Sequence, residues 1–534
     1  MTKTRIAKGT TRRGVLKAGA AGLALTSAIG IAPRFIGRPA HAADLAPGMT
    51  GGPTGFAGAE RYQYNGDMSE GRAIEGIKAL KAAGKAPDKL IMMILDGAIG
   101  QLVKSFPEGA DTVQQVWERD SGVKLEFITV ATGEEFTKIL RDVTAQEAAY
   151  DVYTMPWNSL GDLVEAGALV NCDDFAAAHK PDFDDPERGY VGGERGVRQL
   201  TYYDGHRYAV SLDGDYQCWV YRRDLFENED ERKNFKAKYG YELDYPQTYE
   251  QLDQTAEFFN RPDQGLLGCT DLRNQGWGYT NWYQRYATLG SPNQFLFDDA
   301  GNPLIDGEAG VKAAQEYVDS LKWHSKDAVS WSWPEQYGNM GEGGAAMTCA
   351  FSNMPKFLDN PGTKVGGKLI SALPPGRKQG DGLVRRSVLW YSAIAGVSTQ
   401  SKFPEAAWLF TQWLGSTRTY TWMTGNPAGY YDPFQLANFT DPLVEQSYKG
   451  YHLPTMQGDV ARGVPSLNVA GAQAFHNALD ENLVAATTGQ KTAEQAMKDT
   501  AEEWRKLIKK KGGDKLVGAI NAYQATWPDL VDKA

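Results

Sequence analysis

Short apolar runs alternate with helical segments between residues 90 and 155, and this alternation limits the fold more than any other feature of the sequence. The first run, 90–95, is continuously apolar, which is typical of a strand buried on both faces of a sheet. Segments with helical spacing separate it from two further strand-like runs, at 124–130 and 150–155. Strands that alternate with helices form βαβ units around a parallel sheet. We therefore predict an α/β fold.

Length and charge restrict the class of protein further. The chain has 534 residues, 42% of them hydrophobic, which is enough for two or more lobes with their own cores. Residues 1–42 contain eight Lys and Arg and no acidic residue, so the rest carries a net charge of −18 within a total of −10. Such an acidic body lacks the basic face that nucleic acids and anionic membranes require. We expect no nucleic-acid partner.

The first 42 residues have the parts of an export signal. A basic start is followed by an uncharged, Ala- and Gly-rich stretch at 18–32 and by small residues at Ala40 and Ala42. The run 11–17, Thr-Arg-Arg-Gly-Val-Leu-Lys, resembles a twin-arginine signal. We predict export to the periplasm by that route and cleavage after Ala42. The apolar stretch is shorter than the roughly 20 residues that span a bilayer, so no membrane insertion of the mature chain is expected.

Motifs of common enzymes and metal sites are missing from the sequence. The histidines form no HExxH pair, no GxSxG occurs, and the GxxxxGK match at 362–368 is followed by Leu369 instead of Ser or Thr. We expect no cofactor and no metal. The four cysteines are widely spaced without CxxC, so disulfides and buried free thiols both remain open. These cysteines are Cys172, Cys218, Cys269 and Cys349.

Seven short segments form an ordered set, although each is a weak signal alone. They are DVYTMPWNSLGDLVEAGALV at 151–170 (followed by DDF at 173–175), YDGHRYAVSL at 203–212, WVYRRDLF at 219–226, PQTYEQL at 246–252, GEGGAAM at 341–347, PEAAWLF at 404–410 and GQKTAEQA at 489–496. In this order they resemble the extracellular solute-binding proteins of sugar ABC importers (family 1, maltose-binding-protein-like). The chain departs from that pattern at Ser211, where the family has Pro, and in its greater length.

The resemblance implies a two-lobed α/β periplasmic-binding-protein fold of type II, with a ligand cleft between lobes that crossing hinge segments join. We expect the crossings near 209–213, 372–376 and 415–430. The expected domains are the signal peptide at 1–42, an N-terminal arm and helix at 43–84, a first lobe at 85–212 and 376–420, and a second lobe at 213–375 and 421–534. The Gly- and Pro-rich segment 43–65 predicts a flexible part of the arm.

Sugars present apolar C–H faces and a rim of hydroxyls, so a sugar site needs flat aromatic rings and planar polar groups. Most candidates follow predicted strands at the edge where open α/β sheets bind ligands, lie at the first expected hinge, or belong to an aromatic-rich region near 277–333. Trp390 begins a returning strand, and Arg462 lies in a Gly- and Pro-rich segment, where its side chain could bind vicinal hydroxyls or a carboxylate. The candidate ligand-binding residues are Asp96, Trp157, Asn158, Asp213, Asp215, Trp277, Trp282, Trp331, Asn353, Trp390 and Arg462.

The resemblance implies a periplasmic protein that binds a sugar or short oligosaccharide and delivers it to the permease subunits of an ABC importer. We expect a monomer without catalytic activity. Two alternatives remain open. One is an exported carbohydrate-active enzyme, a glycosidase or lyase, since Asp213, Asp215 and Glu335 are possible paired carboxylates. The other is a binding protein for a polyol or a polyamine.

Overall fold

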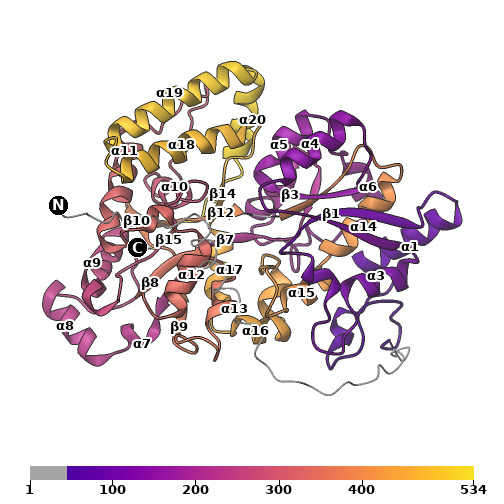
Figure 1. Ribbon diagram of the computed structural model, residues 1–534, viewed down its shortest axis with the longest axis horizontal. Coiled ribbons are helices and arrows are strands. Elements are labelled where there is room, and N and C mark those ends of the chain that lie inside the picture. The colour runs from indigo at the N-terminus through magenta and orange to yellow at the C-terminus, as the bar shows by residue number, and fades with distance from the viewer. Residues whose placement is uncertain (1–44, 392, 534) are drawn as a thin grey trace, which may run out of the picture. The chain divides into compact units, whose positions relative to one another are not determined.

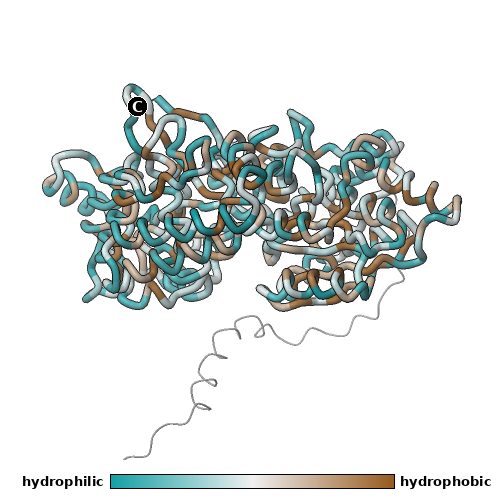
Figure 2. The backbone as a smooth tube through the Cα atoms, turned by 90° about the horizontal axis from the view of Figure 1, so that it is seen from above, coloured by the Kyte–Doolittle hydropathy of each residue, from teal (hydrophilic) through white to brown (hydrophobic). Residues whose placement is uncertain are grey.

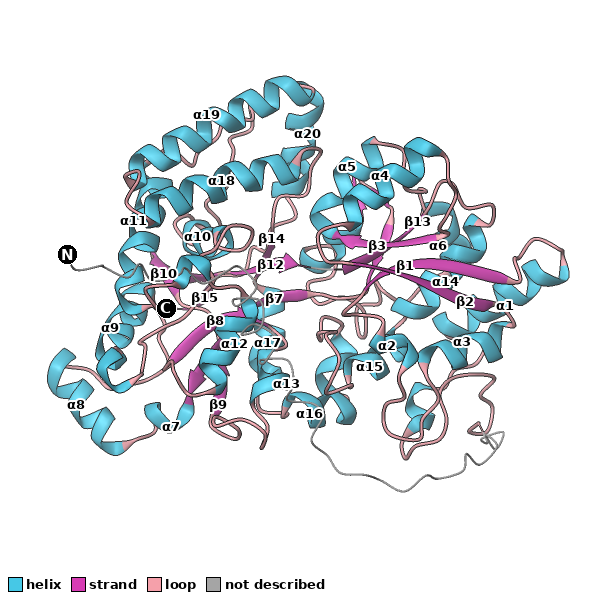
Figure 3. Cartoon of the chain, viewed as in Figure 1, coloured by secondary structure: helices cyan, strands magenta, loops and turns pink. Residues whose placement is uncertain are grey.

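The computed structural model describes residues 45–391 and 393–533, so the predicted signal peptide lies outside the described residues. Leu45–Ala534 form one compact unit. Two β-sheets organise it, each with helices packed around it (Figure 1). Figure 3 shows the same view coloured by helix and strand. The two sheets define the two lobes described below.

The first sheet confirms the predicted βαβ arrangement. Its strands, in spatial order, are β2 (Lys124–Val130), β1 (Lys89–Leu95), β3 (Val152–Pro156), β13 (Ala393–Val397) and β6 (Ala209–Ser211). β1 is parallel to both β2 and β3, whereas β13 is antiparallel to β3 and β6. The last four residues of β1 are all buried, as its continuous apolar run predicts.

Helices from residues 69–179 and from residues 404–424 surround the first sheet. They are α1 (Ser69–Ala82), α2 (Gly100–Val103), α3 (Val113–Ser121), α4 (Glu135–Ala145), α5 (Leu160–Glu165), α6 (Asp173–His179), α14 (Pro404–Gly415) and α15 (Thr417–Thr424). Local sequence sets their ends. Thr112 and Gln115 form a capping box at the start of α3, and Gly122 ends that helix with a left-handed φ of 69°. In Figure 1 the orange α14 lies among the indigo helices, beside α1.

The second sheet is built around a central strand in which every residue but Arg222 is buried. Its spatial order is β14 (Gly463–Pro465), β12 (Ser387–Tyr391), β7 (Asp215–Arg222) and β8 (Met347–Phe351), and β9 (Leu369–Ala372) also pairs with β7. Smaller sheets join β10 (Gly376–Gln379), β11 (Gly382–Arg385) and β15 (Asp532–Lys533), and pair β4 (Tyr202–Tyr203) with β5 (His206–Arg207). β7 is the central strand because it pairs with β8, β9 and β12.

The remaining helices belong mainly to this second half. They are α7 (Arg223–Phe226), α8 (Glu229–Tyr239), α9 (Tyr249–Phe259), α10 (Tyr279–Ala287), α11 (Glu308–Asp319), α12 (Trp333–Gly341), α13 (Met354–Leu358), α16 (Pro442–Tyr448), α17 (Leu453–Ala461), α18 (Ala472–Thr487), α19 (Ala493–Lys511) and α20 (Asp514–Gln524). Hydrophilic and hydrophobic stretches alternate along the backbone in Figure 2, as expected of amphipathic helices. Among the described residues, no helix is long and apolar enough to cross a membrane.

In the described chain, passages between the two sheets occur from β6 to β7, from β12 to β13 and from β13 to β14. The first is at a predicted place, the second is unexpected, and the stretch from β13 to β14 includes the third expected crossing at 415–430. β6 leads into β7 through 212–214, where the first crossing was expected. The second passage runs from β12 to β13, not through 372–376. The prolines at 374 and 375 do end β9, but the following β10–β11 hairpin and β12 stay with the second lobe. The segment 376–391 therefore does not belong to the first lobe; the other lobe boundaries stay a prediction.

The described part of the arm is packed against the first lobe, contrary to the flexible segment expected for 43–65. The hydroxyl of Tyr64 donates to Asp120 Oδ2 at 2.7 Å and accepts a bond from Trp413 Nε1 at 2.9 Å. Gly51 pairs with Tyr64 through backbone hydrogen bonds. A composition rich in Gly and Pro predicts flexibility only when no large side chain is anchored, and here buried Tyr64 anchors the segment.

Each of the four cysteines is a buried free thiol. Of the two states that the sequence left open, the structure has the thiols.

Candidate ligand-binding site

A cavity of about 190 Å³ lies between the two lobes. Loops that follow β1 and β2 contribute to one side, elements around β8 and α12 contribute to the other, and the crossing segments contribute the rest. The lining residues are Leu95, Gly97, Ala98, Thr132, Asp213, Asp215, Trp277, Trp333, Tyr337, Phe351, Asn353 and Tyr430. The cavity therefore lies at the carboxyl ends of parallel strands, where open α/β sheets bind ligands.

Five aromatic side chains form the wall of this cavity: Trp277, Trp333, Tyr337, Phe351 and Tyr430. The Trp277 ring meets Phe351 edge-on at 5.4 Å between centroids, and Trp333 meets Tyr337 in the same way at 5.6 Å. Trp333 and Tyr430 remain 38% and 37% exposed. Because such large apolar rings are usually buried, their exposure at the cavity leaves flat surfaces that a solute can cover.

Three carboxyl groups form the floor. Asp213 and Asp215 lie at the crossing from β6 to β7, and Asp432 follows Tyr430 and Tyr431 in the segment after α15. All three are buried, and each offers an oxygen within 4.8 Å of the other two. Desolvation, and after it the neighbouring carboxylates, raises the pKa of Asp213 and of Asp215 well above the usual range. Desolvation also raises the pKa of Asp432.

One buried ammonium group lies near these carboxyls. Lys356, on α13, donates from Nζ to the backbone carbonyls of Gly429 at 2.9 Å and Tyr431 at 2.8 Å. Its Nζ also lies 4.7 Å from the centroid of the Tyr448 ring. Desolvation lowers the pKa of Lys356 to about 8, although the three carboxylates oppose this shift. Lys356 thus ties α13 to the crossing segment and offsets part of the negative charge of the floor.

Asn353 connects the aromatic wall to the acidic floor. Its Oδ1 accepts a hydrogen bond from the Tyr337 hydroxyl at 2.5 Å, and its Nδ2 lies 3.4 Å from both Asp215 Oδ1 and Asp432 Oδ2. No His or Cys is among the described residues of this floor, so a metal here would have to be one that prefers oxygen ligands.

Four of the predicted site residues line the cavity: Asp213, Asp215, Trp277 and Asn353. A fifth, Trp390, packs directly behind the wall, with 4.1 Å between its centroid and that of Phe351. Asp96 is exposed beside the cavity, and its neighbours Gly97 and Ala98 supply the lining in its place.

The other predicted residues lie elsewhere. Trp157 is fully buried and donates from Nε1 to the Trp390 carbonyl at 3.3 Å, while Asn158 reaches Gln473 at 3.5 Å. Trp282 is a core residue stacked on Tyr286.

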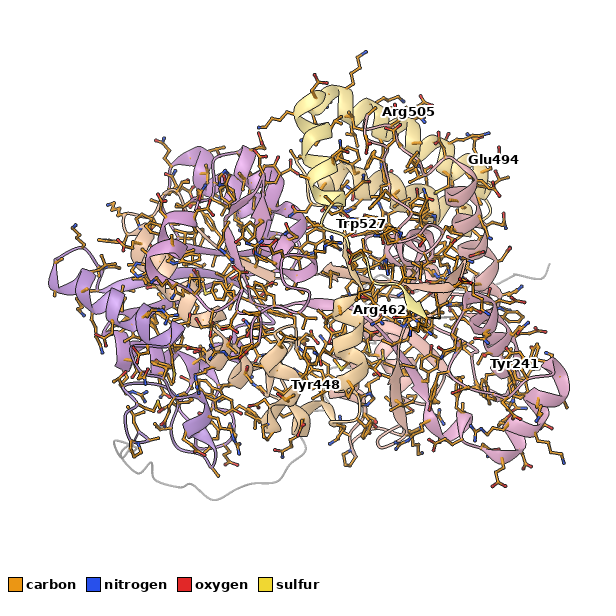
Figure 4. The ribbon with its side chains drawn as sticks, turned by 180° about the vertical axis from the view of Figure 1, so that it is seen from behind. Tyr241, Tyr448, Arg462, Glu494, Arg505 and Trp527 are labelled. Atoms are coloured by element: carbon orange, nitrogen blue, oxygen red, sulfur yellow. The ribbon has the colours of Figure 1, made fainter. Side chains whose placement is uncertain are left out.

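Trp331 and Arg462 also lie away from the cavity. Trp331 is half-buried and lies just before α12, outside the lining. Arg462 forms an ion pair with Asp532, and Figure 4 shows it beside the C-terminal strand β15. The position of each residue shows what it contacts in the protein; its role toward a ligand stays a prediction.

Sequence reasoning missed Trp333, Tyr337, Phe351 and Tyr430 of the wall, and Asp432 and Lys356 of the floor. Trp333 belongs to the aromatic-rich region that was recognised, but nothing in its spacing separates it from Trp331. The run Tyr430-Tyr431-Asp432 begins at the end of the third expected crossing, 415–430, and that position was the available signal.

Wider hollows occur at other places on the described chain. One of about 560 Å³ lies between the arm and α15, and another of about 790 Å³ lies beside α9 and β10. Charged side chains dominate the lining of the first, and both lie away from the space between the two sheets. We favour the smaller cavity as the solute site because, of these three, it alone lies between the lobes and is lined by tryptophan rings together with convergent polar groups.

A family model described as bacterial extracellular solute-binding protein matches residues 99–421. A probable amino-acid ABC transporter periplasmic-binding protein of Sinorhizobium fredii is 23% identical over 76% of this chain and 87% of its own length. The mannitol-binding protein of Pseudomonas aeruginosa is 24% identical over 59% of this chain and 72% of its own.

Among solved structures, an ABC transporter solute-binding protein of Agrobacterium radiobacter, in complex with ribitol, superposes with a TM-score of 0.63. It is 20% identical, and the match covers 78% of this chain and 98% of that one. The fold is therefore that of the two-lobed type II periplasmic binding proteins. Because the family model covers more than half of the chain, this protein belongs to the bacterial extracellular solute-binding protein family.

Proposed function

We propose that this protein binds a small polyhydroxylated solute, a monosaccharide or a polyol, and delivers it to the permease of an ABC importer. One observation carries the proposal: an interlobe cavity in which aromatic rings face carboxyl and amide groups. Its volume of about 190 Å³ is below the roughly 300–1,000 Å³ of sites for drug-sized ligands. A single sugar unit or an acyclic polyol suits that volume better than an oligosaccharide does.

The chemistry of the lining suits such a solute. Trp277 and Trp333 offer flat faces for C–H groups, and Asp213, Asp215 and Asn353 offer acceptors and donors for hydroxyls. A carboxyl group with a raised pKa keeps its proton to a higher pH than a free carboxyl group does, and in the protonated form it can donate as well as accept. Vicinal hydroxyls both donate and accept hydrogen bonds, so they need partners in the site that can do both.

An amino acid suits the cavity less well, although one relative carries that label. An α-carboxylate is bound most strongly by a cationic partner, and none of the described residues that line the cavity is Lys or Arg. The nearby Lys356 ammonium is already engaged by backbone carbonyls. The mannitol-binding relative and the ribitol-bound structure are the better guides.

We propose that the lobes close over the solute and that the closed form is recognised by the permease. The solute would be delivered unchanged, so we propose no catalytic activity. Export through the twin-arginine route, cleavage after Ala42 and a monomeric state in the periplasm are parts of the same proposal.

The experiment is a thermal-unfolding screen of the chain from Ala43 onward, refolded from denaturant to remove any carried-over solute. The panel contains monosaccharides, polyols, oligosaccharides, polyamines and amino acids. A ligand that binds only the folded state adds about 4 kcal/mol of stability at a thousandfold excess over Kd. We expect a polyol or monosaccharide to raise the midpoint and to be recovered unchanged. Stabilisation by amino acids alone, or consumption of the sugar, would contradict the proposal.

A further inference from the structure

His476 is a buried histidine whose ring nitrogens have no partner in the described chain. It lies on α18, and the residue is 3% exposed. Neither Nδ1 nor Nε2 meets a hydrogen-bond donor or acceptor among the described residues. A neutral imidazole carries one N–H donor and one nitrogen acceptor, and burying both without partners costs free energy. The burial of His476 therefore opposes the packing in which its ring takes part.

The His476 ring lies in a contact between the two lobes. Tyr279, on α10 of the second lobe, stacks on it with 4.7 Å between centroids and 16° between planes. Trp157, which directly follows β3 of the first lobe, lies 6.4 Å from it between centroids. Next to this pair, Asn158 Nδ2 lies 3.5 Å from Gln473 Oε1, one turn earlier on α18. The first turns of α18 thus contact the residues that follow β3.

Opening of the cleft separates these rings. β3 is parallel to β1, and the loops that follow β1 and β2 line the cavity. Trp157, at the carboxyl end of β3, therefore lies along the same edge of the sheet. When the lobes move apart at that edge, the side of His476 that faces Trp157 meets water. The imidazole is then dry in the closed form and hydrated in the open form.

The surroundings of His476 favour its neutral form in the closed arrangement. Desolvation lowers the pKa of His476 to about 3, and no charged group of the described chain opposes this shift. The residues that directly follow β3, 157–159, include no titratable side chain. The titratable groups on the other elements around it are Tyr279 and Tyr283 on α10, Tyr317 on α11, Asp480 and Glu481 on α18, Asp162 and Glu165 on α5, Lys511 on α19 and Lys515 on α20.

The charged members of this set already have partners. Asp162 pairs with Lys511 at 3.4 Å, and Glu165 pairs with Lys515 at 2.7 Å. Asp480 accepts hydrogen bonds from two backbone N–H groups of the loop before α10. A proton on His476 would therefore leave a buried positive charge without a counterion in the closed form.

We propose that His476 makes closure of the lobes over the solute dependent on pH, so that acid opens the cleft and releases the solute. This inference rests on the proposed function and adds a regulation of the same site. In the open form the hydrated imidazole takes up a proton as an ordinary histidine does. Because the closed form binds fewer protons, closure becomes less favourable as the pH falls through the pKa of the open form. By reciprocity, solute binding in acid releases a proton.

Titration calorimetry tests the inference on the refolded chain from Ala43 onward, with mannitol, ribitol and glucose as the probes. With an ordinary histidine pKa of about 6.5 in the open form, the dissociation constant should rise about eightfold from pH 7 to pH 5.5. Titrations at pH 5.5 in two buffers of different ionisation enthalpy should show about 0.9 proton released for each solute bound. A dissociation constant that changes less than twofold, or binding without proton release, would overturn the inference.

Variants assign the effect to the imidazole. His476→Phe keeps a flat ring against Tyr279 and removes both nitrogens, so the affinity at pH 7 should be equal or tighter and its pH dependence should fall below twofold. His476→Gln should lose the pH dependence in the same way, and it serves if the first variant does not fold. His206→Gln is the matched control, since His206 is an exposed histidine paired with Asp173, and it should keep the eightfold change.

Persistence of the pH dependence in the His476 variants would overturn the inference and assign the effect to another group. The first such group to examine is Asp480, because desolvation raises its pKa to about 7. Asp480→Asn in the His476→Phe background would then remove the remaining dependence.

A measurement on the unmodified protein separates the remaining outcomes. In the NMR spectrum, the His476 ring signals, assigned by their loss in His476→Gln or His476→Phe, should titrate near pH 6.5 without solute and stay those of a neutral ring down to pH 5 in saturating probe. Titration at the same pH in both states would overturn the inference and leave the proposed function standing. If no sugar or polyol binds at any pH, the proposed function fails and the inference fails with it.

Discussion

The Asp215 carboxyl group is disfavoured as an anion in the folded protein, because it is buried beside Asp213 and Asp432. Its pKa is therefore higher in the folded than in the unfolded state, where it is about 3.9. Between those two values the folded state binds more protons, so the contribution of Asp215 to stability falls as the pH rises through that window. The destabilising Asp215 carboxyl group thus lies in the region that the solute is proposed to occupy.

Asp215→Asn should consequently stabilise the protein in the absence of solute. We expect a gain in the free energy of unfolding of about 1 kcal/mol at pH 7, since each unit of pKa shift corresponds to about 1.4 kcal/mol. The gain should be larger at pH 8 than at pH 5. Urea unfolding at the three pH values measures it, with Asp263→Asn as the control. A gain that does not depend on pH would show that repulsion between carboxylates is not the cause.

Two tryptophans two residues apart should differ in their importance for binding. Trp333 lines the cavity and is 38% exposed, whereas Trp331 lies outside the lining. Covering a large aromatic side chain contributes about 1.5–3 kcal/mol, so Trp333→Ala should weaken solute binding at least tenfold. Trp331→Ala should change the affinity less than threefold. Calorimetric titration of solute into both variants measures the two affinities. Equal losses of affinity would mean that the solute does not lie against Trp333.

At the scale of elements, the wall depends on contacts made behind it. Asp480, on α18, accepts hydrogen bonds from the backbone N–H groups of Tyr279, at 3.1 Å to Oδ1, and of Gly276. These two residues flank Trp277, whose ring lines the cavity. α18 thus fixes the loop before α10 without its own side chain lining the cavity.

Asp480→Ala should therefore weaken binding although Asp480 is not among the lining residues. We expect a three- to tenfold loss of affinity, since the loop that carries Trp277 loses two hydrogen bonds, each with a net contribution of about 1 kcal/mol. Asp480→Asn, which keeps one acceptor oxygen, should lose less. Titration of solute into the variants measures the effect. Full affinity in Asp480→Ala would mean that the loop is held by its other contacts.

The sequence predicts the strands and helices of the first lobe because each depends on local periodicity. It also predicts Asp213 and Asp215, since a crossing between lobes lies at the cleft whatever the packing around it. It does not predict which of Trp331 and Trp333 faces the cavity, because that depends on where α12 begins. Nor does it exclude Arg462, whose partner Asp532 is brought to it by a C-terminal strand far along the chain.

At the scale of the whole molecule, the lobes also meet through α5. α5 of the first lobe lies against the segment that follows β14 of the second. Asp162 on α5 accepts a hydrogen bond from the Gly471 N–H at 2.8 Å, and Glu165 pairs with Lys515 at 2.7 Å. Any opening of the cleft must keep or rearrange this contact, so it is a restraint on hinge motion.

Gly161 brings the two backbones together at this contact. A methyl group added at Gly161 would lie 2.7 Å from the carbonyl carbon of Val469 and 2.8 Å from the nitrogen of Ala470, and backbone atoms cannot yield as a side chain can. Gly161→Ala must therefore separate α5 from that segment. We expect a loss of about 1–3 kcal/mol in the free energy of unfolding, as is typical of overpacking, together with a change in solute affinity as the lobes shift.

Gly338→Ala is the matched control for this prediction. Gly338 also lies in a helix, and an added methyl group meets no heavy atom of the described chain within 4 Å. Alanine at this position should leave the free energy of unfolding unchanged or raise it. The reason is that alanine restricts the backbone conformations of the unfolded chain more than glycine does. Urea unfolding and solute titration of both variants compare the two sites. If Gly161→Ala is as stable as Gly338→Ala and binds solute equally well, close approach of α5 to 469–471 does not restrain the hinge.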